Sequence, residues 1–234
     1  MASLPLPLNY QAERFFYYKK DNQASELFEQ LSTQENYLRD NHPYSAVDLE
    51  MSGLDPVSDK IIQIAWIPIH FTDNCLYFDE NQLFTDVKVK HVAKEVLDLT
   101  HIKQQDLNNA NSIKQILKHN DLQLRDLPVI GHHVCSDLEF MLFNLRKHAS
   151  KQLSDLRYLD SFYLSNAKLP HLQDHHLQTL EEYYHINAPM HNAYADAISS
   201  AVIYWYLQNN VQPDEVANVT IGKEPDGKTI KLVK

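Results

Sequence analysis

The sequence predicts an α/β fold in which a mixed β-sheet is covered by helices on both faces. Short apolar or alternating runs, typical of strands, follow one another closely within residues 44–87 and recur at 128–132 and 157–162. Stretches with the i, i+3, i+4 apolar spacing of helices lie between and after them. Alternation of strands with helices indicates a sheet covered on both sides, and the closely spaced first strands make that sheet mixed.

The strand expected over residues 44–50 carries an unusual pattern. Apolar Val47, Leu49 and Met51 alternate with Asp48 and Glu50. Successive side chains of a strand point to opposite faces, so the two carboxylates share one face, roughly 7 Å apart, while the apolar side chains enter the core. Neighbouring carboxylates repel each other, and a bound divalent cation would offset that cost. Taken alone, such a pair is more typical of a strand face in contact with water.

The remaining elements follow from the same two periodicities. Further strands, predicted from short apolar runs, lie at about 60–69, 75–78, 82–87, 128–132 and 157–162. Helices, predicted from apolar side chains spaced about 3.6 residues apart, lie at about 92–99, 113–117, 138–145, 177–184 and 193–207.

We expect three regions along the chain. Residues 1–42 form an N-terminal helical extension, and 43–208 form the main domain. In the tail, 209–234, apolar residues alternate on either side of the turn sequence Glu224-Pro225-Asp226-Gly227, which predicts a C-terminal β-hairpin.

Composition narrows the class of protein. The chain has 234 residues, of which 44% are hydrophobic and 22% charged, as in a soluble globular protein. Its longest nearly uninterrupted apolar run, 61–69, is far shorter than the roughly 20 residues that span a bilayer. Two cysteines are too few for a disulfide framework or a C-x-x-C zinc site. Without a recognisable signal peptide, we expect a cytoplasmic protein.

The chain is acidic, with a net charge of −10. This charge argues against a dedicated nucleic-acid coat protein, which normally carries an excess of Lys and Arg. It does not argue against an enzyme that approaches phosphates through bound cations, because acidic residues would then hold those cations.

Three more residues extend the Asp48-x-Glu50 pair. Asp137 falls in the first turn of the helix after strand 128–132, where it could also simply complement the helix dipole. Asp196 lies near the start of helix 193–207, and His191 precedes it by five residues. On a continuous helix His191 and Asp196 would be about 140° apart. They can converge only if His191 lies in the preceding loop, which Pro189 favours.

In this order, Asp48-x-Glu50, Asp137 and His191-x4-Asp196 resemble the DEDDh exonucleases. These form the histidine branch of the DnaQ-like 3′→5′ exonucleases, which includes the proofreading subunit of bacterial replicative DNA polymerase (DNA polymerase III epsilon), RNase T and oligoribonuclease. The resemblance covers about residues 44–208. It implies a ribonuclease H-like fold with a mixed five-stranded sheet and helices on both faces.

The motifs match different branches of that family. Residues 48–56 are most similar to the first motif of oligoribonuclease, 131–140 to the second motif of the proofreading and RNase T branch, and 191–197 to the third motif. Two positions depart from the pattern: Met51 replaces a common Thr, and His133 replaces the usual Asn. These departures leave the substrate preference open.

The resemblance implies a metal-dependent 3′→5′ exonuclease that acts on single-stranded DNA or RNA and releases nucleoside 5′-monophosphates. Two Mg²⁺ or Mn²⁺ ions would be its cofactors. Asp48 would bridge both ions, Glu50 and Asp196 would complete the first site, and Asp137 would hold the second ion through water. His191 would act as general base.

Substrate contacts and partners are less defined. Positions beside the motifs that we expect to contact substrate are Met51, Ser52, Leu54 and His133. The sequence leaves open whether the chain forms a homodimer or binds a polymerase. Alternatives to an exonuclease are a catalytically silent nucleic-acid-binding module with the same fold and a metallo-phosphodiesterase for small nucleotides.

Overall fold

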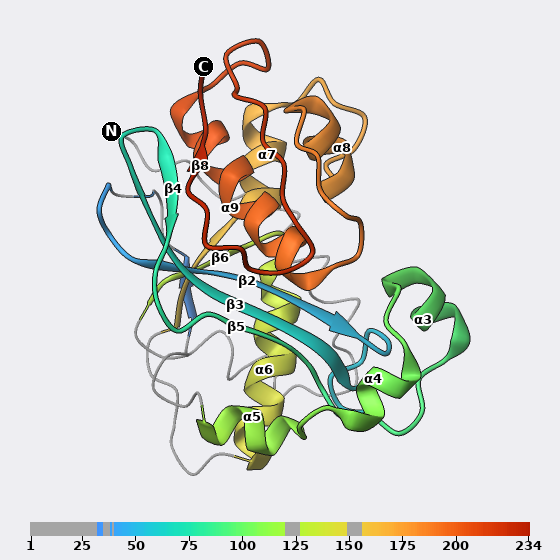
Figure 1. Cartoon of the computed structure of the whole chain (residues 1–234). Helices are drawn as coiled ribbons and strands as arrows, with labels where there is room; N and C mark the ends of the chain where they lie inside the picture. The colour runs from blue at the N-terminus through green and yellow to red at the C-terminus, as the bar shows by residue number, and fades with distance from the viewer. Residues whose placement is uncertain (1–31, 35–37, 39, 120–126, 149–155) are drawn as a thin grey trace.

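The computed structural model describes residues 32–34, 38, 40–119, 127–148 and 156–234 (Figure 1). Its strands are β1 (Ser32–Gln34), β2 (Tyr44–Met51), β3 (Ile61–Thr72), β4 (Cys75–Phe78), β5 (Leu83–Asp86), β6 (Val129–Gly131), β7 (Leu156–Asp160) and β8 (Ile230–Lys231). Its helices are α3 (Lys94–Thr100), α4 (Gln104–Asn109), α5 (Ile113–His119), α6 (Val134–His148), α7 (Ser161–Lys168), α8 (Leu177–Tyr183) and α9 (Ala193–Asn209).

All eight strands join one mixed sheet in the order β1-β7-β6-β2-β3-β4-β8, with β5 also paired to β3. Strands β1, β7, β6 and β2 run parallel to one another, whereas β3 is antiparallel to β2, β4 and β5. The long strand β3 pairs with β5 near its start and with β4 near its end. The mixed α/β architecture is confirmed, but the predicted number of five strands is wrong. Strands β1 and β8 are too short to show a periodic pattern.

Helices cover both faces of the sheet (Figure 1). On one face, α6 packs on β2 and contributes to a core that contains Val47 and Leu49. On the other face, α9 crosses β2 and β3, and its core contains Ala46. Since side chains of a strand alternate, Asp48 and Glu50 lie on the α9 face, in register with Ala46. The predicted alternation of β2 therefore determines the face on which a site can form.

Helix α9 is apolar on all sides, and nearly every residue of it is buried. It packs against the sheet, α7 and α8, and the chain after it also covers it, because the Tyr206 hydroxyl donates to the Leu232 carbonyl at 2.8 Å. A helix that is apolar all round belongs in the interior of a domain. The residues that α9 carries at its N-terminus are therefore held by the core itself.

The predicted C-terminal β-hairpin is wrong in its pairing. Thr220 forms a bridge with Asn187, and β8 pairs with β4. Within the tail, Val216 forms a single antiparallel bridge with Val233. The apolar side chains of the two segments predicted to pair belong to the core between α9 and the sheet, which contains Ala46 and which we call the α9-side core. An isolated two-stranded ribbon could not bury them as fully.

Other predictions need smaller corrections. The N-terminal helical extension falls mostly outside the described residues, and its described part at 32–34 is β1, paired with β7. The strand expected to reach 162 ends at Asp160, because the Asp160 carboxylate caps α7 by accepting from the Phe162 N–H at 3.0 Å. Helices α4 and α7 were not predicted. In the described residues no helix has both the length and the apolar character needed to cross a membrane.

Candidate active site

Asp48 and Glu50 project from β2 beneath the start of α9. Both are only partly exposed to solvent. Burial, together with the charges of Asp137, Asp196 and Glu50, holds the pKa of Asp48 well above its usual range. Burial raises the pKa of Glu50 to about 7. Without a counter-charge, the site therefore favours protonated carboxyl groups over a cluster of anions.

Asp137 reaches this pair from the first turn of α6. Its carboxylate accepts a hydrogen bond from the Leu49 N–H at 3.1 Å, on the backbone between Asp48 and Glu50. The side chain is buried, and this burial raises its pKa well above the ordinary value although the Leu49 N–H opposes the rise. Asp137 therefore does more than complement a helix dipole, because it joins α6 to the acidic part of β2.

The N-terminus of α9 brings the last two residues to the site. Asn192 is the N-cap, and its side chain accepts from the Ala195 N–H at 3.0 Å. His191 precedes the cap, with φ of 50°, and Asp196 lies in the first turn. One donor atom from each of Glu50, His191 and Asp196 lies within 4.8 Å of the other two. The expected position of His191 in a loop before the helix is confirmed.

The donor set fits a hard divalent cation. Burial, with the charges of Glu50 and Glu181 next in size, raises the pKa of Asp196 to about 8. Among the described residues no Lys or Arg forms an ion pair with Asp48, Glu50, Asp137 or Asp196. Carboxylate oxygens are the ligands that Mg²⁺ and Mn²⁺ prefer, and cations of this kind would relieve the repulsion.

The predicted substrate contacts fall into two groups. Leu54 is 69% exposed in the loop after β2, and His133 is exposed at the start of α6. Met51 packs partly against the α6-side core. The Ser52 hydroxyl accepts from the Lys60 N–H at 2.9 Å and so helps to close the loop. Leu54 is free to meet a ligand, whereas the His133 ring stacks on Phe162 with the ring centroids 3.6 Å apart. Met51 and Ser52 also serve the fold.

Three further polar residues lie around the site and belong to no motif of the sequence. Gln63 is buried in β3 and accepts from the Ala193 N–H. Glu181 of α8 is buried near Asp196. Asp160, beside Gly131 in the sheet, accepts from the His133 N–H at 3.1 Å. A polar residue inside the apolar run 61–69 was the only signal for Gln63, whereas nothing local marked the other two.

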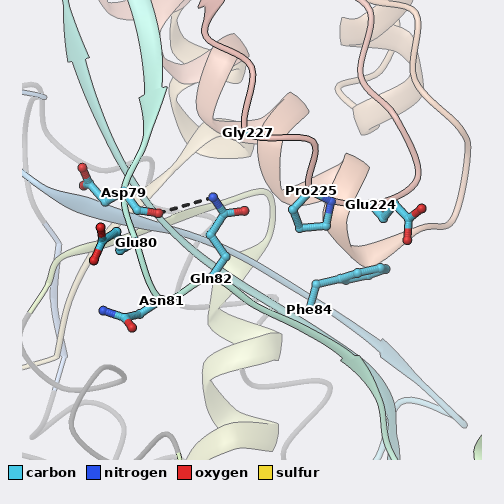
Figure 2. A pocket seen from close by; sticks show the side chains of 8 residues that line it. All are labelled: Asp79, Glu80, Asn81, Gln82, Phe84, Glu224, Pro225 and Gly227. Atoms are coloured by element: carbon cyan, nitrogen blue, oxygen red, sulfur yellow. Dashed lines mark hydrogen bonds between the residues drawn. The ribbon is translucent and has the colours of Figure 1, made fainter.

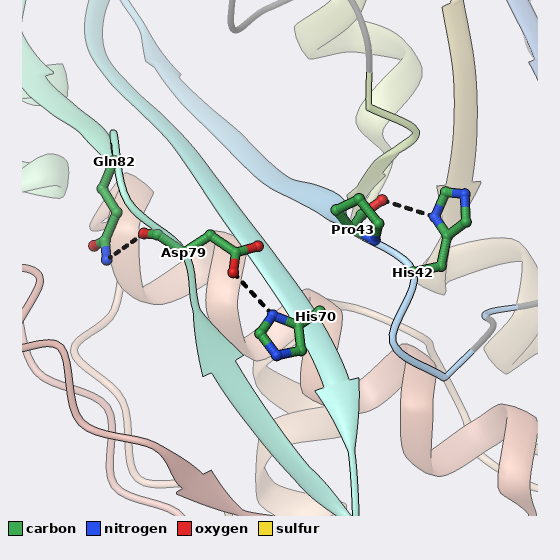
Figure 3. Close-up of polar contacts among 5 residues, drawn as sticks. All are labelled: His42, Pro43, His70, Asp79 and Gln82. Atoms are coloured by element: carbon green, nitrogen blue, oxygen red, sulfur yellow. Dashed lines mark hydrogen bonds and ion pairs between the residues drawn. The ribbon is translucent and has the colours of Figure 1, made fainter.

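A hollow of about 530 Å³ lies elsewhere, between the β4–β5 turn and residues 224–227 (Figure 2). Its lining is Asp79, Glu80, Asn81, Gln82, Phe84, Glu224, Pro225 and Gly227. Polar contacts order this turn: the His70 ring nitrogen lies 2.9 Å from the Asp79 carboxylate, and the Gln82 amide donates to the Asp79 carbonyl (Figure 3). None of the five candidate residues lines this hollow.

A family model described as an exonuclease of the RNase T type matches residues 45–204. The chain belongs to this exonuclease family. Its matched region includes Asp48, Glu50, Asp137, His191 and Asp196, so the chain is a DEDDh exonuclease of the DnaQ-like kind. By family it is a nuclease, and thus a hydrolase.

Relatives of this exonuclease domain include much longer proteins. "DNA polymerase III PolC-type" of Oceanobacillus iheyensis is 24% identical over 172 residues, which are 73% of this chain and 12% of the relative. The protein of the same name from Latilactobacillus sakei is 27% identical over 166 residues, which are 70% of this chain and 11% of the relative. The chain thus spans about a tenth of the length of these polymerases.

Solved exonuclease structures share the fold. E. coli Exonuclease I in complex with a dA16 oligonucleotide has a TM-score of 0.60 and 14% identity, covering 74% of this chain and 42% of the other. Cell-death related nuclease 4 (CRN-4) has a TM-score of 0.60 and 15% identity, covering 79% of this chain and 68% of the other. The ribonuclease H-like fold is confirmed by these neighbours.

Proposed function

We propose that this exonuclease domain is a metal-dependent 3′→5′ exonuclease that removes nucleoside 5′-monophosphates from the 3′ end of single-stranded DNA or RNA. The observation that carries the proposal is the convergence of five groups from β2, α6, α9 and the loop before α9. Glu50, His191 and Asp196 present donor atoms within 4.8 Å of one another, and Asp137 binds the backbone between Asp48 and Glu50.

The four carboxylates are suited to hold cations. Two Mg²⁺ or Mn²⁺ ions, held by Asp48, Glu50, Asp137 and Asp196, would activate water and stabilise charge on the phosphoryl oxygens and the leaving oxygen. Because burial raises the pKa values of these groups, binding must displace protons from them. Activity should therefore increase with pH while the carboxyl groups lose those protons.

His191 is suited to accept the proton of the attacking water. It lies beside Glu50 and Asp196, and its side chain remains partly exposed, so that water can reach it. A ring nitrogen of neutral imidazole can accept a proton from water, as a general base must. Unlike the carboxylates, His191 sits on a loop, where the ring can meet both water and substrate.

Substrate preference rests on the relatives. The Exonuclease I complexes hold DNA oligonucleotides, and the polymerase relatives favour a polymerase as a partner of this chain. We infer that Leu54 contacts a terminal base of the substrate, and the support for this is that its side chain is largely exposed in the loop that follows Glu50. Either DNA or RNA would present the required 3′ end.

The proposal predicts a metal-dependent ladder. We would incubate the protein with 5′-labelled single-stranded DNA or RNA, with Mn²⁺ or with EDTA. Labelled products should shorten stepwise from the 3′ end only with Mn²⁺, and Asp48→Ala should abolish the ladder while retaining the circular dichroism spectrum. Asp79→Asn, an acidic residue of the β4–β5 turn, is the matched control and should keep the ladder.

Two outcomes would contradict the proposal. Binding of the oligonucleotide without shortening of either substrate would identify a silent binding module. Hydrolysis of a chromogenic nucleotide ester without a ladder would identify a phosphodiesterase for small nucleotides.

A further inference from the structure

Gln63 lies at the centre of a row of polar side chains that crosses three strands. In the sheet register, Glu50 of β2 pairs with Gln63 of β3, and Gln63 pairs with Asp86 of β5. Paired residues of antiparallel strands project from the same face. Glu50, Gln63 and Asp86 therefore share the α9 face of the sheet. Gln63 is only 7% exposed, so its amide must find partners inside the protein.

Both ends of this amide are bonded. The Gln63 Nε2 group donates to Asp86 Oδ1 at 2.8 Å, and the Gln63 Oε1 atom accepts from the Ala193 N–H at 3.1 Å. A carboxylate can only accept and a backbone N–H can only donate, so only one orientation of the amide satisfies both neighbours. Asp86 thus fixes the direction in which Gln63 presents its oxygen.

The bond to Ala193 holds the beginning of α9. Ala193 is the first residue of this helix, where backbone N–H groups have no partner within the helix. The N-cap Asn192 satisfies the N–H of Ala195, and Gln63 satisfies that of Ala193. His191 lies two residues before Ala193, and Asp196 lies three residues after it. The hydrogen bond from Ala193 to Gln63 therefore anchors the chain between the two residues that face Glu50.

We propose that Gln63, oriented by Asp86, is a positioning residue that sets the N-terminus of α9 against the sheet, so that His191 and Asp196 face Glu50. Its consequence for catalysis rests on the proposed function, whereas its consequence for α9 does not. In an active site, misplacement of reacting groups by about 1 Å can cost on the order of 10² in rate. Loss of the amide should therefore reduce kcat more than it changes KM.

The first test replaces Gln63 with leucine, which has similar size and cannot make either bond. Exchange of the Ala193 amide hydrogen, measured by NMR, should become at least about tenfold faster. Binding of Mn²⁺, measured by calorimetry, should weaken, and kcat should fall about 10- to 100-fold with KM nearly constant. Asp79→Asn is the control for a changed polar side chain away from α9, beside β4, and should leave all three values unchanged.

The second test exchanges the roles of donor and acceptor. Gln63→Glu places two carboxylates against each other and should impair the protein, whereas Asp86→Asn keeps an acceptor and should be mild. In the double variant Q63E/D86N, the new amide at position 86 can donate to the new carboxylate at position 63, which still accepts from the Ala193 N–H. The double variant should therefore recover Ala193 protection and kcat relative to Q63E.

Three results would overturn the proposal. Unchanged exchange of the Ala193 amide in Q63L would show that Gln63 does not hold α9, and faster exchange with unchanged kcat would show that catalysis does not depend on this bond. A double variant no better than Q63E would show that Asp86 does not orient Gln63. If Q63L fails to fold, exchange of the Ala193 amide hydrogen can be measured in Asp86→Ala, because Asp86 is only half-buried. If the wild type is inactive, Ala193 exchange and Mn²⁺ binding still test whether Gln63 holds α9.

Discussion

His191 adopts a left-handed backbone conformation, with φ of 50°, directly before the N-cap of α9. For a residue other than Gly this conformation is uncommon and costs of order 1 kcal/mol, so the surrounding structure must enforce it. His133 in the second motif has φ of 55°. Asn, the residue usual at that position, also tolerates this conformation, so the backbone accommodates the departure from the family pattern.

At the residue scale, we predict that His191→Gln lowers kcat by about 10²- to 10⁴-fold with little change in KM, because the variant loses a general base. Single-turnover cleavage of a labelled oligonucleotide would measure the effect. His185→Gln is the matched control, since His185 has φ of 55° and is exposed in the same loop region. A loss of less than threefold in His191→Gln would contradict the assigned role.

At the element scale, the carboxyl end of β6 must approach β2 and α6 closely. A Cβ atom on Gly131 would lie 2.6 Å from Val134 Cγ2 and 2.8 Å from the Val47 carbonyl oxygen. No flexible side-chain end can absorb this overlap, because one of the two partners is backbone. Gly131 therefore allows the contact that places Asp137 next to β2.

We predict that Gly131→Ala lowers the free energy of unfolding by about 1–3 kcal/mol through this overlap. Urea denaturation followed by circular dichroism would measure it. The control is Gly222→Ala, where the nearest atom to a new Cβ lies at 3.6 Å, an ordinary contact distance. Equal stability changes in the two variants would contradict the explanation.

At the scale of the whole molecule, the acidic cluster couples stability to pH and to metal. Burial raises the pKa of Glu50 from 4.5 to about 7 and that of Asp196 from 3.8 to about 8. The folded protein therefore binds more protons than the unfolded chain between about pH 4 and pH 8, so its stability must fall as pH rises through this range.

We predict that the metal-free protein loses stability from pH 5 to pH 8, with a contribution on the order of 3 kcal/mol from Glu50. Mn²⁺ should raise Tm more at pH 8 than at pH 5, because protons compete with the cation at low pH. Thermal denaturation with Mn²⁺ or EDTA would measure both effects. In Glu50→Gln the pH slope and the Mn²⁺ effect should both diminish. Equal Mn²⁺ effects at the two pH values would refute the coupling.

Elements with a strong local pattern could be predicted from the sequence, and elements held by distant partners could not. Strand β2 and helix α9 follow from alternation and apolar content. Strands β1 and β8 exist only because β7 and β4 offer free edges for pairing. The pairing of the predicted hairpin failed for the same reason: Thr220 bridges with Asn187, and Ile230 and Lys231 pair with β4.

The chemical groups of the site can be predicted from the chain alone, because the types and order of Asp48, Glu50, Asp137, His191 and Asp196 carry the family pattern. How these groups meet depends on contacts between distant parts of the folded chain. The hydrogen bond from Ala193 to Gln63 joins residues 130 positions apart, and no local periodicity encodes such a contact. A buried helix takes the position in which its apolar side chains are packed and its buried polar groups are hydrogen-bonded. For α9 that position depends on Gln63 of β3, which approaches Ala193 only in the folded chain.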